Sequence, residues 1–416
     1  MSAHKPKLPL AEEAITLSKG SLWRKMPLIA GLIGIVALGL TISMGSKDHS
    51  VVYYGSYLVS FLFFLTIALG GLFFVLIHYA AKAGWSTVIR RLPEAIMGTL
   101  PLFALLTIPL LLGGDHNGLH TLFHHWMDKA AVAKDPILQG KSAYLNTGFF
   151  FARAIFYFGF WILCSQWYLR NSIKQDTVGG EEITRKLQFW SPMGIMFFAL
   201  SVTFAGFDWV MSIDPHWYST IFGVYIFAGC VVSLHAVVAL ITIGLRASGY
   251  LNNIVTKEHD HDVGKMIFAF TVFWSYIAFS QFMLIWYANI PEETKWFQYR
   301  LFGEWQPLTI ALALGHFVVP FFFLMSRHVK RNPFTLAFGA IWMLAFHLVD
   351  LYWLIMPTLY HHGHKHFHTQ DLLFLVLSFV GIGSLFLAGT TWWLGRSSLV
   401  PKQDPRLPES LSFENI

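Results

Sequence analysis

Long apolar runs separated by short polar segments dominate the pattern of residues along the chain. An α-helix needs roughly 20 apolar residues to cross the hydrocarbon core of a bilayer. Ten runs meet that requirement, and the charged residues lie mostly between them. The pattern predicts an all-α integral membrane protein with spans at about 26–44, 52–80, 93–113, 145–169, 188–212, 217–245, 266–290, 305–326, 334–356 and 371–395.

The composition agrees with this fold class. Hydrophobic residues make up 55% of the 416 positions and charged residues only 12%, against about 25% charged residues in soluble domains. No stretch between the apolar runs could bury a soluble core. We therefore expect an N-terminal segment (1–25), one membrane domain (26–396) and a C-terminal tail (397–416).

The two cysteines and the basic charge exclude several classes of protein. Cys164 and Cys230 fall in different predicted spans, so they predict neither a disulfide framework nor a thiolate metal site. The net charge of +6 would favour nucleic-acid binding in a soluble protein. In a membrane protein it is better explained by topology and by attraction to anionic lipids, so we expect lipid contacts and no nucleic-acid partner.

The distribution of Lys and Arg predicts the orientation. Of the 29 basic residues, 21 fall on the side of the two termini, seven fall on the opposite side, and Arg153 lies inside a span. Cytoplasmic loops are enriched in Lys and Arg. We therefore expect both termini in the cytoplasm.

One short pattern occurs twice. The fifth span contains Phe204, Asp208 and, after it, Pro215; the ninth contains Phe346, Asp350 and Pro357 at the same spacings. Aspartate is rare inside membranes, so the match suggests two related halves, and internal repeats are common in membrane carriers. Coincidence in an aromatic-rich sequence is the alternative.

Ionisable side chains inside spans are functional candidates, because each costs ~2.5–3.5 kcal/mol to insert. Ordered by depth, they form a series from one membrane surface to the other, and Asp350 lies one turn from His347 on the same helix face. Histidine titrates near neutral pH and can pass protons on. We therefore predict a proton pathway that includes His235, His316, His347, Asp350, Asp208, Arg153, Tyr276, Glu94 and His78.

Other interpretations of these residues remain open. Arg153 could pair with Asp208 or Asp350 simply to hold helices together, and Glu94 could be interfacial. Haem ligation is a weaker interpretation, because the sixth, eighth and ninth spans each have a single central histidine. Histidines in two predicted outer loops could bind copper or zinc or meet a partner, although such clusters are commonly only solvated: His116, His120, His124, His125, His361, His362, His364, His366 and His368.

Four stretches suggest a family. They are FDWVMSIDPHWY (207–218), FMLIWYANIPEE (282–293), HLVDLYW (347–353) and the basic turn at 327–332. Together with the ten spans, they resemble the F-type membrane subunit of bacterial alternative complex III and, more distantly, the membrane anchor of polysulfide reductase. The resemblance covers essentially the whole membrane domain.

The resemblance implies two four-helix bundles, spans two to five (about 52–212) and six to nine (about 217–356), flanked by spans one and ten. It implies a membrane subunit of a respiratory quinol:cytochrome c, or high-potential iron–sulfur protein, oxidoreductase. The subunit itself would bind no redox cofactor or metal and have no catalytic site, but would offer a proton path. Quinol, haem c and iron–sulfur clusters would belong to its partners: a homologous quinol-site membrane subunit, an iron–sulfur subunit, and multihaem and monohaem cytochrome c subunits. A terminal oxidase is a further partner that it allows.

Two alternatives to a proton-conducting subunit follow from the same residues. The chain could be a scaffold of the same complex, with polar groups that only fix helix registry. It could also be a stand-alone secondary transporter, although matching broken helices in the two halves, which are typical of such carriers, are not evident in the sequence.

Overall fold

The computed structural model describes residues 10–48, 51–113, 121–363 and 369–415, although the side chains of 45–48, 362–363 and 369–370 are not described. All regular secondary structure in these ranges is helical, and ten helical segments are long and apolar enough to span a membrane. The predicted fold class is therefore confirmed. The unbroken spans are α2 (Leu22–Asp48), α3 (Val51–Ala80), α10 (Thr147–Val178), α11 (Glu182–Trp209), α12 (Phe222–Ala247), α13 (Lys257–Ala288), α18 (Pro333–Gly363) and α19 (Thr369–Arg396).

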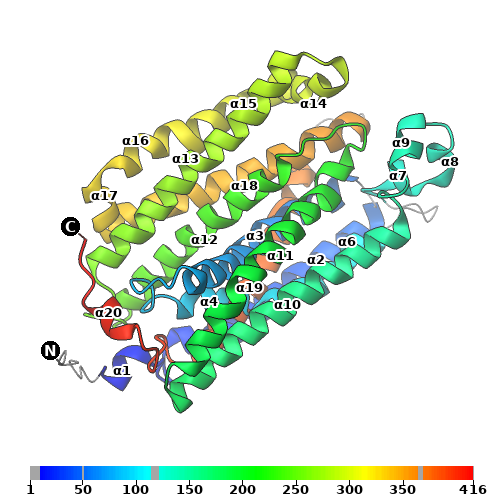
Figure 1. The fold of residues 1–416 in the computed structure, drawn as a ribbon. Helices are drawn as coiled ribbons and strands as arrows, with labels where there is room; N and C mark the ends of the chain where they lie inside the picture. Colours follow the sequence, from blue (N-terminus) through cyan, green and yellow to red (C-terminus); the bar gives the residue numbers. More distant parts are fainter. Residues whose placement is uncertain (1–9, 49–50, 114–120, 364–368, 416) are drawn as a thin grey trace.

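Helix α3 lies at the centre of the molecule (Figure 1). Nearly all of its side chains are buried, because helices surround it on every side. It packs with α4 (Arg91–Met97), α10 and α11 in a first bundle, and on its other side it contacts α12 and α18 of a second bundle, which α13 and α16 (Val319–Met325) complete. These groupings correspond to spans two to five and six to nine.

Helices α2 and α19 form a close pair beside the first bundle. Small residues permit the approach: a Cβ atom at Gly34 would lie 2.7 Å from Leu385, and one at Gly381 would lie 2.8 Å from Leu38. Such small-residue contacts are typical of helix pairs in membranes. The first and tenth spans thus flank one bundle together, through α19 on α3.

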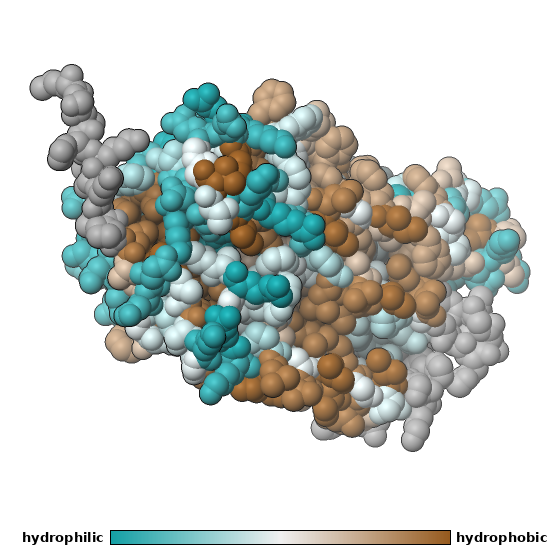
Figure 2. Space-filling model, turned by 90° about the horizontal axis from the view of Figure 1, so that it is seen from below, coloured by the Kyte–Doolittle hydropathy of each residue, from teal (hydrophilic) through white to brown (hydrophobic). Residues whose placement is uncertain are grey.

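The two ends of the bundle differ. The terminal side holds α1 (Glu12–Ile15) and the C-terminal α20 (Leu407–Leu411), and the loop side holds α7–α9 (within 124–141) and α14 (Pro291–Leu301) (Figure 1). The tail is packed against the helix ends: the Leu399 N–H donates to the Ile15 carbonyl at 2.7 Å. Figure 2 shows apolar side chains (brown) along the spans and polar ones (teal) gathered toward the terminal side.

Two spans are interrupted, in a way that the hydropathy pattern did not predict. The third is divided into α4, α5 (Leu100–Leu106) and α6 (Ile108–Leu112), with prolines at 93, 101 and 109. The Gly98 carbonyl at the first break accepts bonds from Trp393 and Gln166, so the break does not leave this carbonyl unpaired within the membrane. The eighth span runs through η2 (Gly303–Trp305), α15 (Gln306–Leu312), the π-helical η3 (Ala313–Val318) and α16.

These interruptions occupy different positions in the two bundles, the second helix of one and the third of the other. The sixth span also begins later than predicted, at Phe222 instead of 217, because residues 214–221 form the turn that follows α11. The two halves are therefore not matched in their helix breaks, which weakens the transporter interpretation.

Candidate functional site

Asp350, on α18, is a buried carboxyl held by two neutral donors. The Tyr225 hydroxyl of α12 donates to Oδ1, and the Trp274 indole N–H of α13 donates to Oδ2 at 3.0 Å. The residue is only 2% exposed. In the described parts of the chain no Lys, Arg or His forms an ion pair with it. A carboxyl in this setting can exchange a proton without breaking a salt bridge.

His316 lies beside the same group of side chains. Its ring stacks on Trp274 with centroids 3.8 Å apart, and the residue is 0% exposed. Neither ring nitrogen has a hydrogen-bond partner among the described residues. The histidine belongs to η3, and π-helical turns occur frequently at functional sites. Two unsatisfied nitrogens inside a membrane domain are costly, so their retention favours a role in proton exchange or water binding.

His347 lies one helical turn from Asp350 and faces α3. Its Nε2 atom is 2.9 Å from the Thr66 hydroxyl, and Nδ1 has no partner among the described residues. Gly229 of α12 makes room for the ring, because a Cβ atom there would lie 2.8 Å from the imidazole. The histidine therefore sits where α3, α12 and α18 meet.

His235 and His78 continue the series toward the terminal side. His235 Nδ1 bonds the Val231 carbonyl at 2.8 Å, and His78 Nδ1 bonds the Phe74 carbonyl at 2.7 Å. The Phe74 ring lies 3.8 Å from the His78 ring and 5.5 Å from the His235 ring, measured between centroids. His235 Nε2 has no partner among the described residues.

Helix geometry aligns these groups. Thr66, Gly70, Phe74 and His78 follow each other at intervals of four, so they share a face of α3. Gly70 brings α12 close, since a Cβ atom there would lie 2.2 Å from the Cys230 carbonyl oxygen. We call the resulting set the central column; it comprises Asp350, His316, His347, Thr66, His235 and His78.

The central column is not a continuous hydrogen-bonded chain. Hydrogen bonds among the described residues connect neither Asp350 to His316 or His347, nor the His347–Thr66 pair to His235, nor His235 to His78. A proton could pass between these groups only through water or through side-chain movement. The geometry therefore supplies a series of separate sites for protons.

Two predicted pathway residues form an ion pair elsewhere. Arg153 of α10 holds Asp208 of α11 through two bonds of 2.8 and 2.7 Å, and the Tyr157 hydroxyl donates to the same carboxylate at 2.7 Å. Arg153 also reaches the Tyr144 carbonyl and stacks on that ring. A bidentate guanidinium–carboxylate pair is strong and specific in its geometry, which suits a structural clamp between the two helices.

Glu94 belongs to a charge cluster at the terminal side. Its carboxylate contacts Arg90 and Arg91, each at 3.2 Å, and accepts a bond from Ser172 at 2.8 Å. The two arginines also pair with acidic groups of other segments, Arg90 with Asp404 and Arg91 with Asp176. Glu94 thus helps to join α4 to α10 and, through Arg90, to the C-terminal tail.

Tyr276 lies apart from the central column, on the outer face of α13, where it is 64% exposed. It lines a lateral cavity of about 690 Å³ on the flank of the second bundle. Tyr225 and Trp274 line the same cavity, and so does Gln281, whose Oε1 atom has no described partner. The two donors to Asp350 therefore border a space that opens to the side of the protein.

Sequence reasoning missed several partners because they are neither acidic, basic nor histidine side chains: Tyr225, Trp274 and Thr66. It also missed Arg300 of α14, which was counted only among the seven basic residues on the side opposite the termini. This fully buried guanidinium donates to the Trp353 and Leu354 carbonyls at 3.1 and 2.8 Å.

Pro357 explains why Arg300 binds there. Proline lacks the N–H that would bond the carbonyl four residues earlier, and Arg300 satisfies that carbonyl, of Trp353, instead. Burial lowers the pKa of Arg300 from 12.5 to about 9, with Asp214 opposing the shift, so the group stays charged at neutral pH.

The outer histidines are only partly described. The His124 and His125 rings lie 3.9 Å apart, and His361 stacks on Tyr299 at 3.7 Å. His116, His120, His364, His366 and His368 lie outside the described residues, as does the side chain of His362. Among the residues that are described, no three His, Cys, Asp or Glu side chains converge as metal ligands would. Whether this chain binds a metal or cofactor therefore stays at the level of a prediction.

A scan against protein-family models found no match, and a search of curated proteins found none either.

Proposed function

We propose that this chain is a membrane subunit of a respiratory quinol:cytochrome c, or high-potential iron–sulfur protein, oxidoreductase of the alternative complex III type. It binds no redox cofactor itself and provides a transmembrane proton pathway coupled to quinol oxidation in a partner subunit. The terminal side faces the cytoplasm of a bacterial cell, as the 21 basic residues on that side favour. The partners are the quinol-site membrane subunit, the iron–sulfur subunit and the cytochrome c subunits.

One observation supports the proton pathway above the others: Asp350 is buried, accepts bonds from Tyr225 and Trp274, and has no described counter-cation. Intramembrane carboxyl and imidazole groups typically mark proton relays. The central column adds imidazoles between this carboxyl and the terminal side, and the lateral cavity reaches its two donors from the flank of the second bundle.

The other two clusters favour a supporting role for part of the predicted pathway. Arg153, Asp208 and Glu94 are held in ion pairs that join helices. A scaffold subunit of the same complex is the second candidate function, and these clamps are the observation that favours it. The two roles are compatible, because different residues carry them.

Membership of a complex is tested by purification of the tagged chain from its native membrane in mild detergent. Co-purification of c-type haem, seen in a reduced-minus-oxidised spectrum, together with quinol:cytochrome c reductase activity would support the proposal. A colourless preparation of this chain alone would contradict it and would favour the stand-alone transporter.

A further inference from the structure

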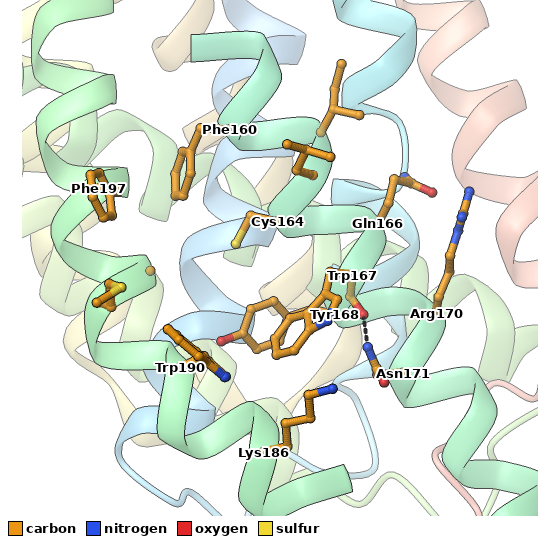
Figure 3. A pocket seen from close by; sticks show the side chains of 14 residues that line it. Phe160, Cys164, Gln166, Trp167, Tyr168, Arg170, Asn171, Lys186, Trp190 and Phe197 are labelled. Atoms are coloured by element: carbon orange, nitrogen blue, oxygen red, sulfur yellow. Dashed lines mark hydrogen bonds between the residues drawn. The ribbon is translucent and has the colours of Figure 1, made fainter. Parts of the chain in front are cut away.

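A second cavity lies far from the central column, on the outer flank of the first bundle. It is a groove of about 990 Å³ between α10 and α11 (Figure 3), near the upper end of the range of about 300–1,000 Å³ that is common for ligand sites. Apolar side chains line most of it, from Phe160 and Phe197 past Cys164 to Trp190. The groove is open toward the surrounding bilayer.

Polar groups gather at one end of this groove. Arg170 and Asn171 of α10 and Lys186 of α11 line its terminal-side end. Both cations are exposed, and neither forms an ion pair with a described residue. The adjacent Arg185, by contrast, pairs with Glu181 at 2.7 Å. Two unpaired cations beside an apolar groove are complementary to a ligand with an anionic head and an apolar tail.

The depth of these cations matches the headgroup region. At 1.5 Å per residue, Arg170 lies about 12 Å before the end of α10 and Lys186 about 6 Å after the start of α11. With 32 residues, α10 is about 48 Å long and extends beyond the ~30 Å hydrocarbon core. The Lys and Arg stems can also extend toward the headgroups.

Tryptophans border the polar end. The Lys186 ammonium lies 5.6 Å from the Trp167 ring centre, and the Asn171 amide donates to the Trp167 carbonyl at 2.8 Å. Figure 3 shows Trp190 on the facing helix, across from Trp167 and Tyr168. Tryptophan is enriched at the level where lipid headgroups meet the acyl chains. Along the groove the lining therefore changes from charged side chains to indole rings to apolar side chains. This order matches the headgroup, interfacial and acyl-chain regions of a phospholipid.

We propose that this groove binds an anionic phospholipid. Its phosphate would lie beside Lys186 and Asn171, and the exposed Arg170 side chain, which Figure 3 shows extended away from Lys186, would turn toward it. One acyl chain would follow the groove past Cys164 to Phe160 and Phe197. Basic pockets between membrane helices select anionic headgroups. The turn at Gly179–Gly180, with φ of 68° and 79°, keeps the two helices that carry these cations side by side.

The test measures phospholipid binding to the full-length chain in mild detergent. The delipidated protein is titrated with palmitoyl-oleoyl-phosphatidylglycerol or with the zwitterionic phosphatidylcholine of the same chains, and bound lipid is counted by native mass spectrometry. Each Lys or Arg near an anionic headgroup contributes about 1 kcal/mol. The variant Arg170→Gln with Lys186→Gln should therefore bind phosphatidylglycerol about 30-fold more weakly, which corresponds to about 2 kcal/mol.

A matched control removes the same charge outside the groove. Lys129→Gln with Lys134→Gln removes two exposed cations on the loop side, away from the groove, and should keep wild-type binding. Equal affinity of the wild-type chain for both lipids would overturn the proposal, and this comparison needs no variant. It would also be overturned if the groove variant kept wild-type binding, or if inorganic phosphate displaced the lipid as well as free phosphatidylglycerol does.

Discussion

The two aspartates of the repeated Phe–Asp–Pro pattern should respond differently to the same substitution. In Asp208→Asn, the buried Arg153 guanidinium loses its carboxylate partner. Removing one member of a buried ion pair typically costs about 3–5 kcal/mol, because an uncompensated charge remains. In Asp350→Asn, no described cation loses a partner, and the amide oxygen can still accept from one of the two donors. One imperfect hydrogen bond costs about 1–2 kcal/mol.

The assay is reversible unfolding of the purified variants in mixed micelles with increasing detergent denaturant, followed by circular dichroism. We expect Asp208→Asn to be less stable than Asp350→Asn by about 1–4 kcal/mol, as the difference of the two estimates. Adding Arg153→Met to Asp208→Asn should recover most of the lost stability, because the unpaired charge of Arg153 is then removed. Equal destabilisation by the two single variants, or no recovery in the double variant, would refute the contrast between a clamped and an unclamped carboxyl.

Three further predictions concern packing and pH. Gly70→Ala should destabilise the fold by about 1–3 kcal/mol through overpacking against the Cys230 carbonyl, whereas Gly39→Ala, with open space around it, should be near neutral; unfolding midpoints compare the two. Arg300→Met should cost about 2–5 kcal/mol, because two α18 carbonyls lose their donor, and faster hydrogen exchange in the second half of α18 would report it. The hydrogen bond from His216 lowers the pKa of Asp135, so its stabilising effect is present above the unfolded pKa of about 4 and is lost as the pH falls through the lower folded value. The stability difference between wild type and Asp135→Asn should therefore shrink in acid; a difference that grows in acid would contradict this sign.

The membrane fold was predictable because it depends on composition over long windows. Ten apolar runs gave ten spans, and most ends agree to within a few residues. The breaks in the third and eighth spans were not predictable. They depend on hydrogen-bond partners for the backbone groups at each break, such as the bonds from Trp393 and Gln166 to the Gly98 carbonyl. These partners are distant in sequence.

The candidate site was predictable in its members but not in its grouping. Intramembrane charge singled out Asp208 and Asp350 equally, and only the fold separates the one held by an arginine from the one held by Tyr225 and Trp274. The sequence also did not predict how each helix is rotated about its own axis. Tyr276 faces outward, although a polar residue in a span suggested an interior position. Neutral partners such as Trp274 gave no signal in the sequence.

Proton movement through Asp350 is the central claim, and the most direct test is the proton-to-electron ratio of the purified complex in sealed vesicles. Quinol oxidation is started on one side while a pH indicator follows the other, and rates are normalised to haem c. We expect Asp350→Asn complexes to assemble and to oxidise quinol, but to move fewer protons per electron than wild type. A fully assembled Asp350→Asn complex with the wild-type ratio would contradict the account.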